Sequence, residues 1–229
     1  MPTTFISLCN QVARRLNEVE IVEGDFASAT GVQALIKDAV KASVAKINQM
    51  EFEWPFNAAE ETDLLVVGQE EYSWPNFFKV VDWNSFQMQA NASLGAGFTT
   101  LEFIERDTYY KKYRNADHTS GTTGITIPRF VFPSHGNGYG VTPSPDKAYT
   151  LKFRYFLNHT DITLHDDVTR IPSSYDTVLI DGALYHLYMF KSNMEAAQAA
   201  YATYEQGVKN LQSLYINNYA SIRDTRIAF

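Results

Sequence analysis

Cysteine is almost missing from this sequence, because Cys9 is the one thiol among 229 residues. A single thiol cannot form a disulfide within the chain, and a zinc site built from thiolates would need more of them. No apolar run is long enough to span a bilayer, and the N-terminus lacks the basic and apolar regions of a signal peptide. We therefore expect a protein that is made in the cytoplasm and has no membrane partner.

Positive charge is also scarce. The sequence has 19 Lys and Arg against 26 Asp and Glu, which gives a net charge of −7. This balance argues against a surface that binds nucleic-acid phosphates over most of its area. The length allows one domain or two small ones, with a sizeable core.

Aromatic residues are abundant, at 14% of the chain. Tyr and Trp favour interfaces, because each combines a large apolar body with a polar group. The enrichment indicates either assembly with other chains or a strand-rich domain.

Residues 171–215 predict a helical hairpin. Pro172 fits the start of a helix, and residues 175–190 are apolar on almost every side, which predicts burial in a core or against another subunit. Ser192 and Glu195 have the spacing of a capping box, so we expect a second helix to begin at Ser192. The apolar stripe predicted for this second helix is Ala196, Ala200, Tyr204, Gly207, Leu211 and Leu214.

Two further helices are predicted near the N-terminus. Thr3 and Thr4 can cap the first, and Thr30 with Gln33 has capping-box spacing for the second, which ends before Pro55. Two helices at each end of the chain suggest a four-helix layer. The predicted stripes are Phe5, Leu8, Val12, Leu16 and Val19 in the first helix, and Ile36, Val40, Val44 and Ile47 in the second.

The middle of the chain predicts β structure. Short β-prone runs occur at residues 64–67, 77–81 and 100–104, and residues 130–132 and 149–156 resemble a hairpin. Residues 107–114 are either a short helix or a loop.

These patterns together predict an α+β fold. It consists of an antiparallel helical bundle from the N- and C-terminal helices, an inserted β-rich region and an extended C-terminal tail. The predicted parts are a helical pair at 1–56, the β-rich insertion at 57–165, a helical hairpin at 166–216 and an arm at 217–229.

Three stretches carry a resemblance to a known family. They are residues 4–18 (TFISLCNQVARRLNE), residues 47–56 (INQMEFEWPF), and residues 142–151 (TPSPDKAYTL), which lead through a strand to Pro172 and a helix pair containing AAYATYE. This succession resembles the head-to-tail adaptor, or connector, proteins of tailed bacteriophages, of the short-tailed type. The likeness covers most of the chain as an order of elements, and its motifs are structural rather than catalytic.

The resemblance implies a virion structural protein of the neck, made in the host cytoplasm, with no enzymatic activity, no cofactor and no metal. It implies a ring of identical subunits, twelve if the chain follows the family. The ring would join the portal protein to a tail nozzle or tail tube protein. Double-stranded DNA would pass through it without specific binding.

Residues 217–229 have no helical stripe and combine apolar with basic side chains, so we expect an arm that becomes ordered on binding. The resemblance implies that this arm docks on the portal. The residues expected to bind are Tyr219, Ile222, Arg223, Arg226, Ile227 and Phe229.

A DNA channel must not hold its cargo, so we expect an acidic or neutral wall. The candidate wall is the β-rich insertion, with the basic residues Lys111, Lys112 and Arg114 turned away from the lumen. The loops expected to supply the acidic side chains carry Glu60, Glu61, Glu70, Glu71 and Asp82.

Two other classes of function remain open from the sequence. Residues 159–167 (HTDITLHDD) hold two imidazoles and three carboxylates, which could bind a divalent cation for a metal-dependent hydrolase, although Asp is also common in such linkers as a turn former. A carbohydrate- or host-binding module is the other alternative, with Trp74, Trp83, Tyr109 and Tyr110 exposed for stacking on sugars.

Overall fold

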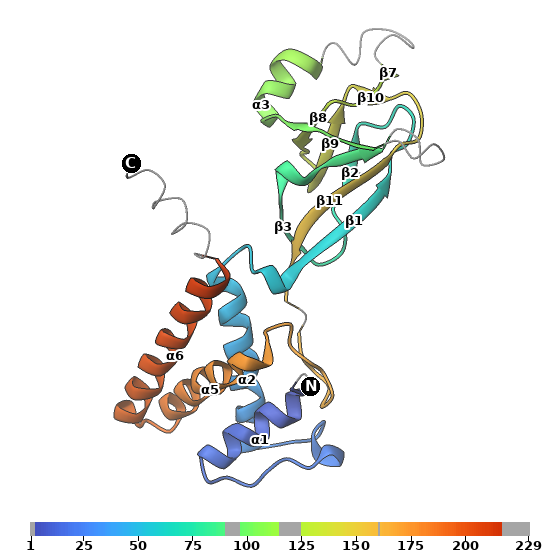
Figure 1. Cartoon of the computed structure of the whole chain (residues 1–229). Helices are drawn as coiled ribbons and strands as arrows, with labels where there is room; N and C mark the ends of the chain where they lie inside the picture. Colours follow the sequence, from blue (N-terminus) through green and yellow to red (C-terminus); the bar gives the residue numbers. More distant parts are fainter. Residues whose placement is uncertain (1–2, 90–96, 115–124, 160, 217–229) are drawn as a thin grey trace, which may run out of the picture. The chain divides into compact units, whose positions relative to one another are not determined.

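The computed structural model describes residues 3–89, 97–114, 125–159 and 161–216, and the fold is α+β, as the sequence predicts. The chain forms two compact units (Figure 1). The helical unit takes residues 1–57 and 158–229, and the β unit takes residues 58–157. The two ends of the chain therefore fold together, and the β unit is inserted between them.

Four helices share one core in the helical unit, and α5 contacts the other three (Figure 1). Trp54 completes this core, with its indole N–H donating to the Ile47 carbonyl oxygen at 2.9 Å. The helices are α1 (Phe5–Arg15), α2 (Val32–Met50), α5 (Asp176–Phe190) and α6 (Met194–Tyr215), with short 3-10 turns at η1 (Glu23–Asp25), η2 (Pro55–Asn57) and η7 (Ser173–Tyr175).

The predicted stripe of the second helix is correct, because all four of its residues are buried, whereas the stripe of the first helix is wrong at its C-terminal end. Asn17 has φ 56°, so the chain turns after α1, and Val19 is 78% exposed instead of buried. The Thr30 capping box does not form, because α2 begins after Gly31, whose φ of 60° suits glycine. Gln33 instead donates to the carbonyl oxygen of Val19.

The second helix of the hairpin, α6, has its N-cap one residue later than predicted. Ser192 has φ 55°, which an N-cap residue does not adopt, and Asn193 caps α6 through its side-chain oxygen, which accepts from the Ala196 amide at 3.2 Å. Leu214 is 51% exposed, and two buried positions of α6, Ala197 and Val208, are not in the predicted stripe. The buried positions of α6 are Ala197, Tyr204, Val208 and Leu211.

Two larger sheets form the β unit. The first has the order β1-β11-β4-β5, with β3 also paired to β11, and the second has the order β2-β9-β8-β6. A short parallel pair joins β10 to β7. The strands are β1 (Ala58–Leu64), β2 (Glu71–Ser73), β3 (Phe78–Val81), β4 (Gln87–Gln89), β5 (Phe98–Thr100), β6 (Glu102–Phe103), β7 (Ile125–Thr126), β8 (Phe130–Pro133), β9 (Gly138–Thr142), β10 (Ser144–Pro145) and β11 (Thr150–Leu157).

The predicted hairpin between residues 130–132 and 149–156 is wrong. β8 pairs with β9 and β6, whereas β11 pairs with β1, β3 and β4. The turn at residues 134–137 is short enough to bring β8 and β9 together directly, which a longer connection to β11 would not favour. The alternation of Leu151, Phe153 and Tyr155 on the buried face of β11 is confirmed.

Residues 107–114, for which the sequence allowed either a short helix or a loop, are helical. Arg106–Thr108 form a helical turn, α3, which continues into a π-helical turn at Tyr109–Tyr113. A 3-10 turn, η3 (Trp83–Ser85), follows β3. These turns border the cavity described next.

Candidate interaction surfaces

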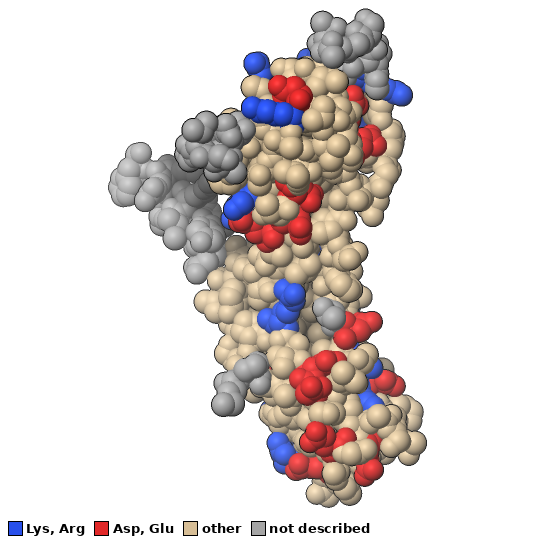
Figure 2. All heavy atoms as spheres, turned by 90° about the vertical axis from the view of Figure 1, so that its right-hand side faces the viewer, with Lys and Arg blue, Asp and Glu red and all other residues tan. Residues whose placement is uncertain are grey.

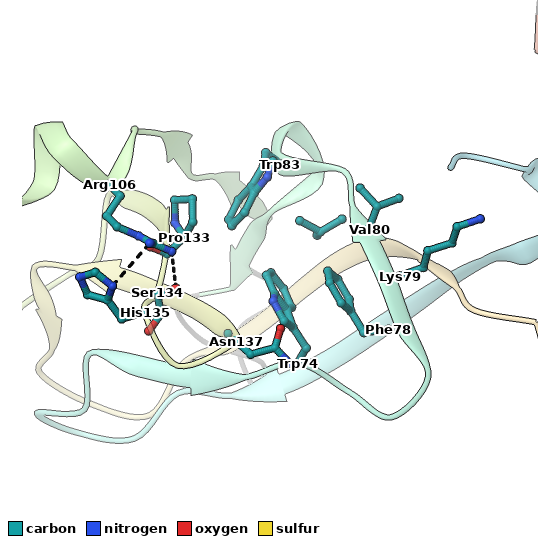
Figure 3. A pocket seen from close by; sticks show the side chains of 12 residues that line it. Trp74, Phe78, Lys79, Val80, Trp83, Arg106, Pro133, Ser134, His135 and Asn137 are labelled. Carbon is teal, nitrogen blue, oxygen red and sulfur yellow. Dashed lines mark hydrogen bonds between the residues drawn. The ribbon is translucent and has the colours of Figure 1, made fainter. Parts of the chain in front are cut away.

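A cavity of about 430 Å³ opens in the β unit, and we call it the aromatic pocket (Figure 3). Trp74 follows β2, Phe78 begins β3, Trp83 begins η3 and Arg106 begins α3, so four separate elements place these side chains together. The turn from β8 to β9 closes the other side with His135. Among the described residues that line the pocket, none is Asp or Glu.

Arg106 is held in place in the wall of this pocket. Its guanidinium donates to the carbonyl oxygens of Pro133 at 3.0 Å and Ser134 at 2.6 Å, and it lies 3.5 Å from Nδ1 of His135 (Figure 3). Arginine has five N–H donors, so these contacts leave donor capacity for a ligand. The pocket therefore combines aromatic and aliphatic side chains with a positioned cation.

The two indoles of the pocket are used inside an aromatic cluster. Trp74 stacks on Phe78 with centroids 4.3 Å apart and meets Trp83 edge to face at 5.7 Å. Trp83 stacks in turn on Phe86 at 5.7 Å. A sugar needs an open ring face, so this packing does not favour the carbohydrate alternative.

Tyr109 was predicted to be exposed, and this is wrong. It is 3% exposed, stacks on Phe132 with centroids 3.8 Å apart, and donates its hydroxyl to Glu70 at 2.8 Å. The π-helical turn packs this ring inward. Tyr110 lies half-buried beside His135.

The acidic residues expected on loops of the β unit divide into two groups, since Glu70 and Asp82 lie between elements, as predicted, and the other three lie in strands. Glu60 and Glu61 lie within strand β1, and the Glu70 carboxylate accepts hydrogen bonds from Tyr109 and Ser144. Asp82 caps η3 and pairs with Arg154 at 2.9 Å, so its charge is partly neutralised within the unit. The remaining acidic residue of this group, Glu71, is exposed on β2.

The segment between α1 and α2 exposes two valines, and we call residues 18–25 the valine loop. Val19 is 78% exposed and Val22 is 66% exposed, while Ile21 between them is buried. The side-chain amide of Asn10 holds Ile21 from both sides, accepting from its N–H at 2.8 Å and donating to its carbonyl oxygen at 3.1 Å. The valines are thus presented on backbone of fixed conformation.

The sequence around the valine loop is acidic. Residues 16–31 contain four carboxylates and no Lys or Arg. Glu18 pairs with Lys191 at 2.7 Å and Glu20 with Arg14 at 2.9 Å, whereas Glu23 lies 3.4 Å from His165. Figure 2 shows Asp and Glu side chains gathered on one face of the helical unit.

The cation site suggested by residues 159–167 is not assembled. His159 faces Asp161 at 3.5 Å, and His165 faces Glu23. Asp167 accepts from the backbone amides of Thr163 and Leu164, which lowers the pKa of its carboxyl, so this residue shapes a turn. Within the described ranges, no group of three or more His, Cys, Asp or Glu side chains could hold a metal ion.

Exposed apolar side chains also gather where α5 meets α6. Met189 is 42% exposed, Phe190 65% and Met194 54%, although the sequence predicted burial along α5 as far as Phe190. None of the described helices has the length and apolar character needed to cross a bilayer. The six residues expected to bind the portal, from Tyr219 to Phe229, lie outside the described residues.

The fold and these surfaces define a class of protein: an α+β chain with an inserted β unit, an aromatic pocket and clustered exposed apolar side chains. The family model described as SU10 adaptor protein matches residues 3–225. The chain therefore belongs to the SU10 adaptor protein family, a family of phage head-to-tail adaptors, and is a phage adaptor structural protein. A comparison with curated proteins gives no significant match.

Proposed function

We propose that this chain is one subunit of a ring that joins the portal of a tailed bacteriophage to its tail and surrounds the passing DNA. The observation that carries the proposal is the family match, which runs over residues 3–225 and so includes both units. The proposed partners are the portal protein, a tail nozzle or tail tube protein, and further copies of this chain, twelve in all. The proposed location is the virion neck.

Exposed apolar groups support assembly. Three large apolar side chains, Met189, Phe190 and Met194, are exposed within six residues of sequence at the α5–α6 connection. Single exposed apolar residues are normal on a monomer, but a cluster of them marks a surface for contact with another chain. The β unit exposes Leu64, Val66, Val67, Phe77, Phe98, Phe103 and Ile127 in addition.

The portal is proposed to bind the C-terminal arm. This arm combines apolar and basic side chains in a segment whose sequence has no helical stripe, as expected of a segment that becomes ordered on its partner. The side chains proposed to make the contact are Tyr219, Ile222, Arg223, Arg226, Ile227 and Phe229.

The channel wall is proposed to be acidic or neutral. Twelve copies at −7 each carry a formal charge of about −84. Each Lys or Arg that met a DNA phosphate would release counterions and create a point of attachment. Lys111, Lys112 and Arg114 are exposed on and beside the π-helical turn, and we assign them to subunit contacts or solvent rather than to the lumen.

Electron microscopy of the purified chain mixed with its portal tests this function. We expect a closed ring attached to one end of the portal. Light scattering gives a simpler first measurement, since a ring has many times the mass of the 25.9 kDa subunit. A chain that stays monomeric both alone and with the portal would contradict the proposal.

A further inference from the structure

The valine loop has features of a preformed ligand. Val19 and Val22 are each more than three-fifths exposed. The two hydrogen bonds from the Asn10 side chain to the Ile21 backbone nevertheless hold the segment in place. A segment ordered before binding loses less conformational entropy when it docks. Glu23 adds a carboxylate that has no Lys or Arg partner in the part of the chain that the structure describes.

The aromatic pocket has the complementary character. Part of its wall is apolar and includes Trp74, Trp83 and Val80, and another part is polar and carries the cation of Lys79 (Figure 3). The Arg106 guanidinium, which also lines the pocket, is suited to a carboxylate. No acidic side chain among the described lining residues would repel one.

We propose that the valine loop of one copy docks in the aromatic pocket of a neighbouring copy. Val19 and Val22 enter the apolar part of the pocket, and the Glu23 carboxylate meets Arg106. This inference rests on the proposed ring, and it names the surfaces through which two neighbouring subunits recognise each other.

The two surfaces lie on different units of the chain, which gives the contact a direction. The loop belongs to the helical unit and the pocket to the β unit, so the contact pairs two different surfaces. Such a contact is heterologous, and it builds a ring when the rotation between copies closes.

Disulfide trapping tests the contact directly. One protein carries Val22→Cys and a second carries His135→Cys, and both replaced residues are exposed. The native Cys9 thiol is buried and its pKa is raised to about 12 by that burial, so it stays unreactive under mild oxidation. We expect a mixture of the two proteins to give a disulfide-linked dimer on a non-reducing gel.

A protein that carries both cysteines should give a ladder of dimers, trimers and larger species, because each copy then has both halves of the contact. The matched control pairs Val67→Cys, in place of Val22→Cys, with His135→Cys. Val67 is also an exposed valine, at 56%, but it belongs to the β unit and lies outside the proposed loop-to-pocket contact. We expect this control to give at least tenfold less cross-linked product.

Two results would overturn the inference while the ring stands. One is an unmodified chain that forms rings while the double-cysteine protein gives no ladder, or only an internal disulfide. The other is Val67→Cys cross-linking as readily as Val22→Cys. A chain that stays monomeric with the portal, measured separately by light scattering, overturns the proposed function and with it this inference.

Discussion

Leu187 and Phe190 lie three residues apart on α5 and have opposite environments. Leu187 is 2% exposed in the core of the helical unit, whereas Phe190 is 65% exposed. We expect Leu187→Ala to lower the free energy of unfolding by about 2–5 kcal/mol, because it removes buried methyl groups and leaves a cavity. Urea denaturation followed by circular dichroism measures this change.

The control for this substitution is Phe190→Ala. Its side chain is mostly in solvent, so in the isolated subunit we expect a change within about 0.5 kcal/mol. Equal losses for the two variants would show that Phe190 is covered by the protein in solution.

The hydroxyl of Tyr204 is buried and has no hydrogen-bond partner among the described residues. Burial raises the pKa of this hydroxyl to about 12. An unsatisfied buried polar group costs about 1–3 kcal/mol, so we expect Tyr204→Phe to leave stability unchanged or to raise it.

Thermal unfolding of the Tyr204→Phe variant provides the measurement. A melting temperature several degrees below that of the unmodified chain would mean that the hydroxyl does have a partner in solution, such as an ordered water.

Among the helices, the crossing of α2, α5 and α6 depends on Gly182. A Cβ added there would lie 2.8 Å from Cε2 of Tyr204 and would also collide with the Ser43 hydroxyl. Alanine is better than glycine in a helix by about 1 kcal/mol, but overpacking costs about 1–3 kcal/mol. We therefore expect Gly182→Ala to lower the melting temperature.

Gly24→Ala is the matched control for that substitution, because nothing lies within 4 Å of a Cβ built at Gly24. It should leave the melting temperature nearly unchanged. If Gly182→Ala instead stabilised the chain, the Tyr204 ring would have to move aside at little cost.

The C-terminal arm yields a prediction for a whole segment. Deleting residues 217–229 should leave the circular dichroism spectrum and the melting temperature almost unchanged, because both described cores lie before residue 217. It should abolish attachment to the portal, as measured by co-sedimentation. Attachment at the normal level by the shortened chain would refute the portal-binding arm.

At the scale of the assembly, the prediction concerns the sign of the field in the channel. We expect the side chains that point at the ring axis to be acidic or uncharged, so that DNA is not retained. A structure of the ring determined by electron microscopy identifies these side chains. A continuous belt of Lys111, Lys112 and Arg114 around the lumen would contradict the prediction.

The affinity of assembled rings for DNA gives a second measurement of the electrostatic field in the channel. Assembled rings should bind double-stranded DNA weakly at moderate salt, and their residual affinity should fall as salt rises. Tight binding at about 200 mM salt would contradict a channel wall that does not retain DNA.

Much of the helical unit followed from the sequence alone. The spacing of Ile36, Val40, Val44 and Ile47 predicted a buried stripe, and all four are buried in the structure. Such a stripe is local information, because a helix with one face in a core repeats its apolar residues every three or four positions. The α+β order and the adaptor family also followed from the sequence, since both are properties of the succession of segments.

Tertiary structure decided the helix ends, the strand pairing and the environment of each aromatic ring. Val19 continued the helical spacing, but Asn17 turns the chain and leaves that valine exposed. β11 pairs with β1, and Ala58 lies opposite Phe156 in this pair. These two residues are at opposite ends of the β unit in the sequence, so no local pattern specifies such a partner. The aromatic pocket was equally hidden, because its walls come from separate elements and meet only in the folded chain. Periodicity reports which face of a segment is buried, whereas long-range packing determines what buries it.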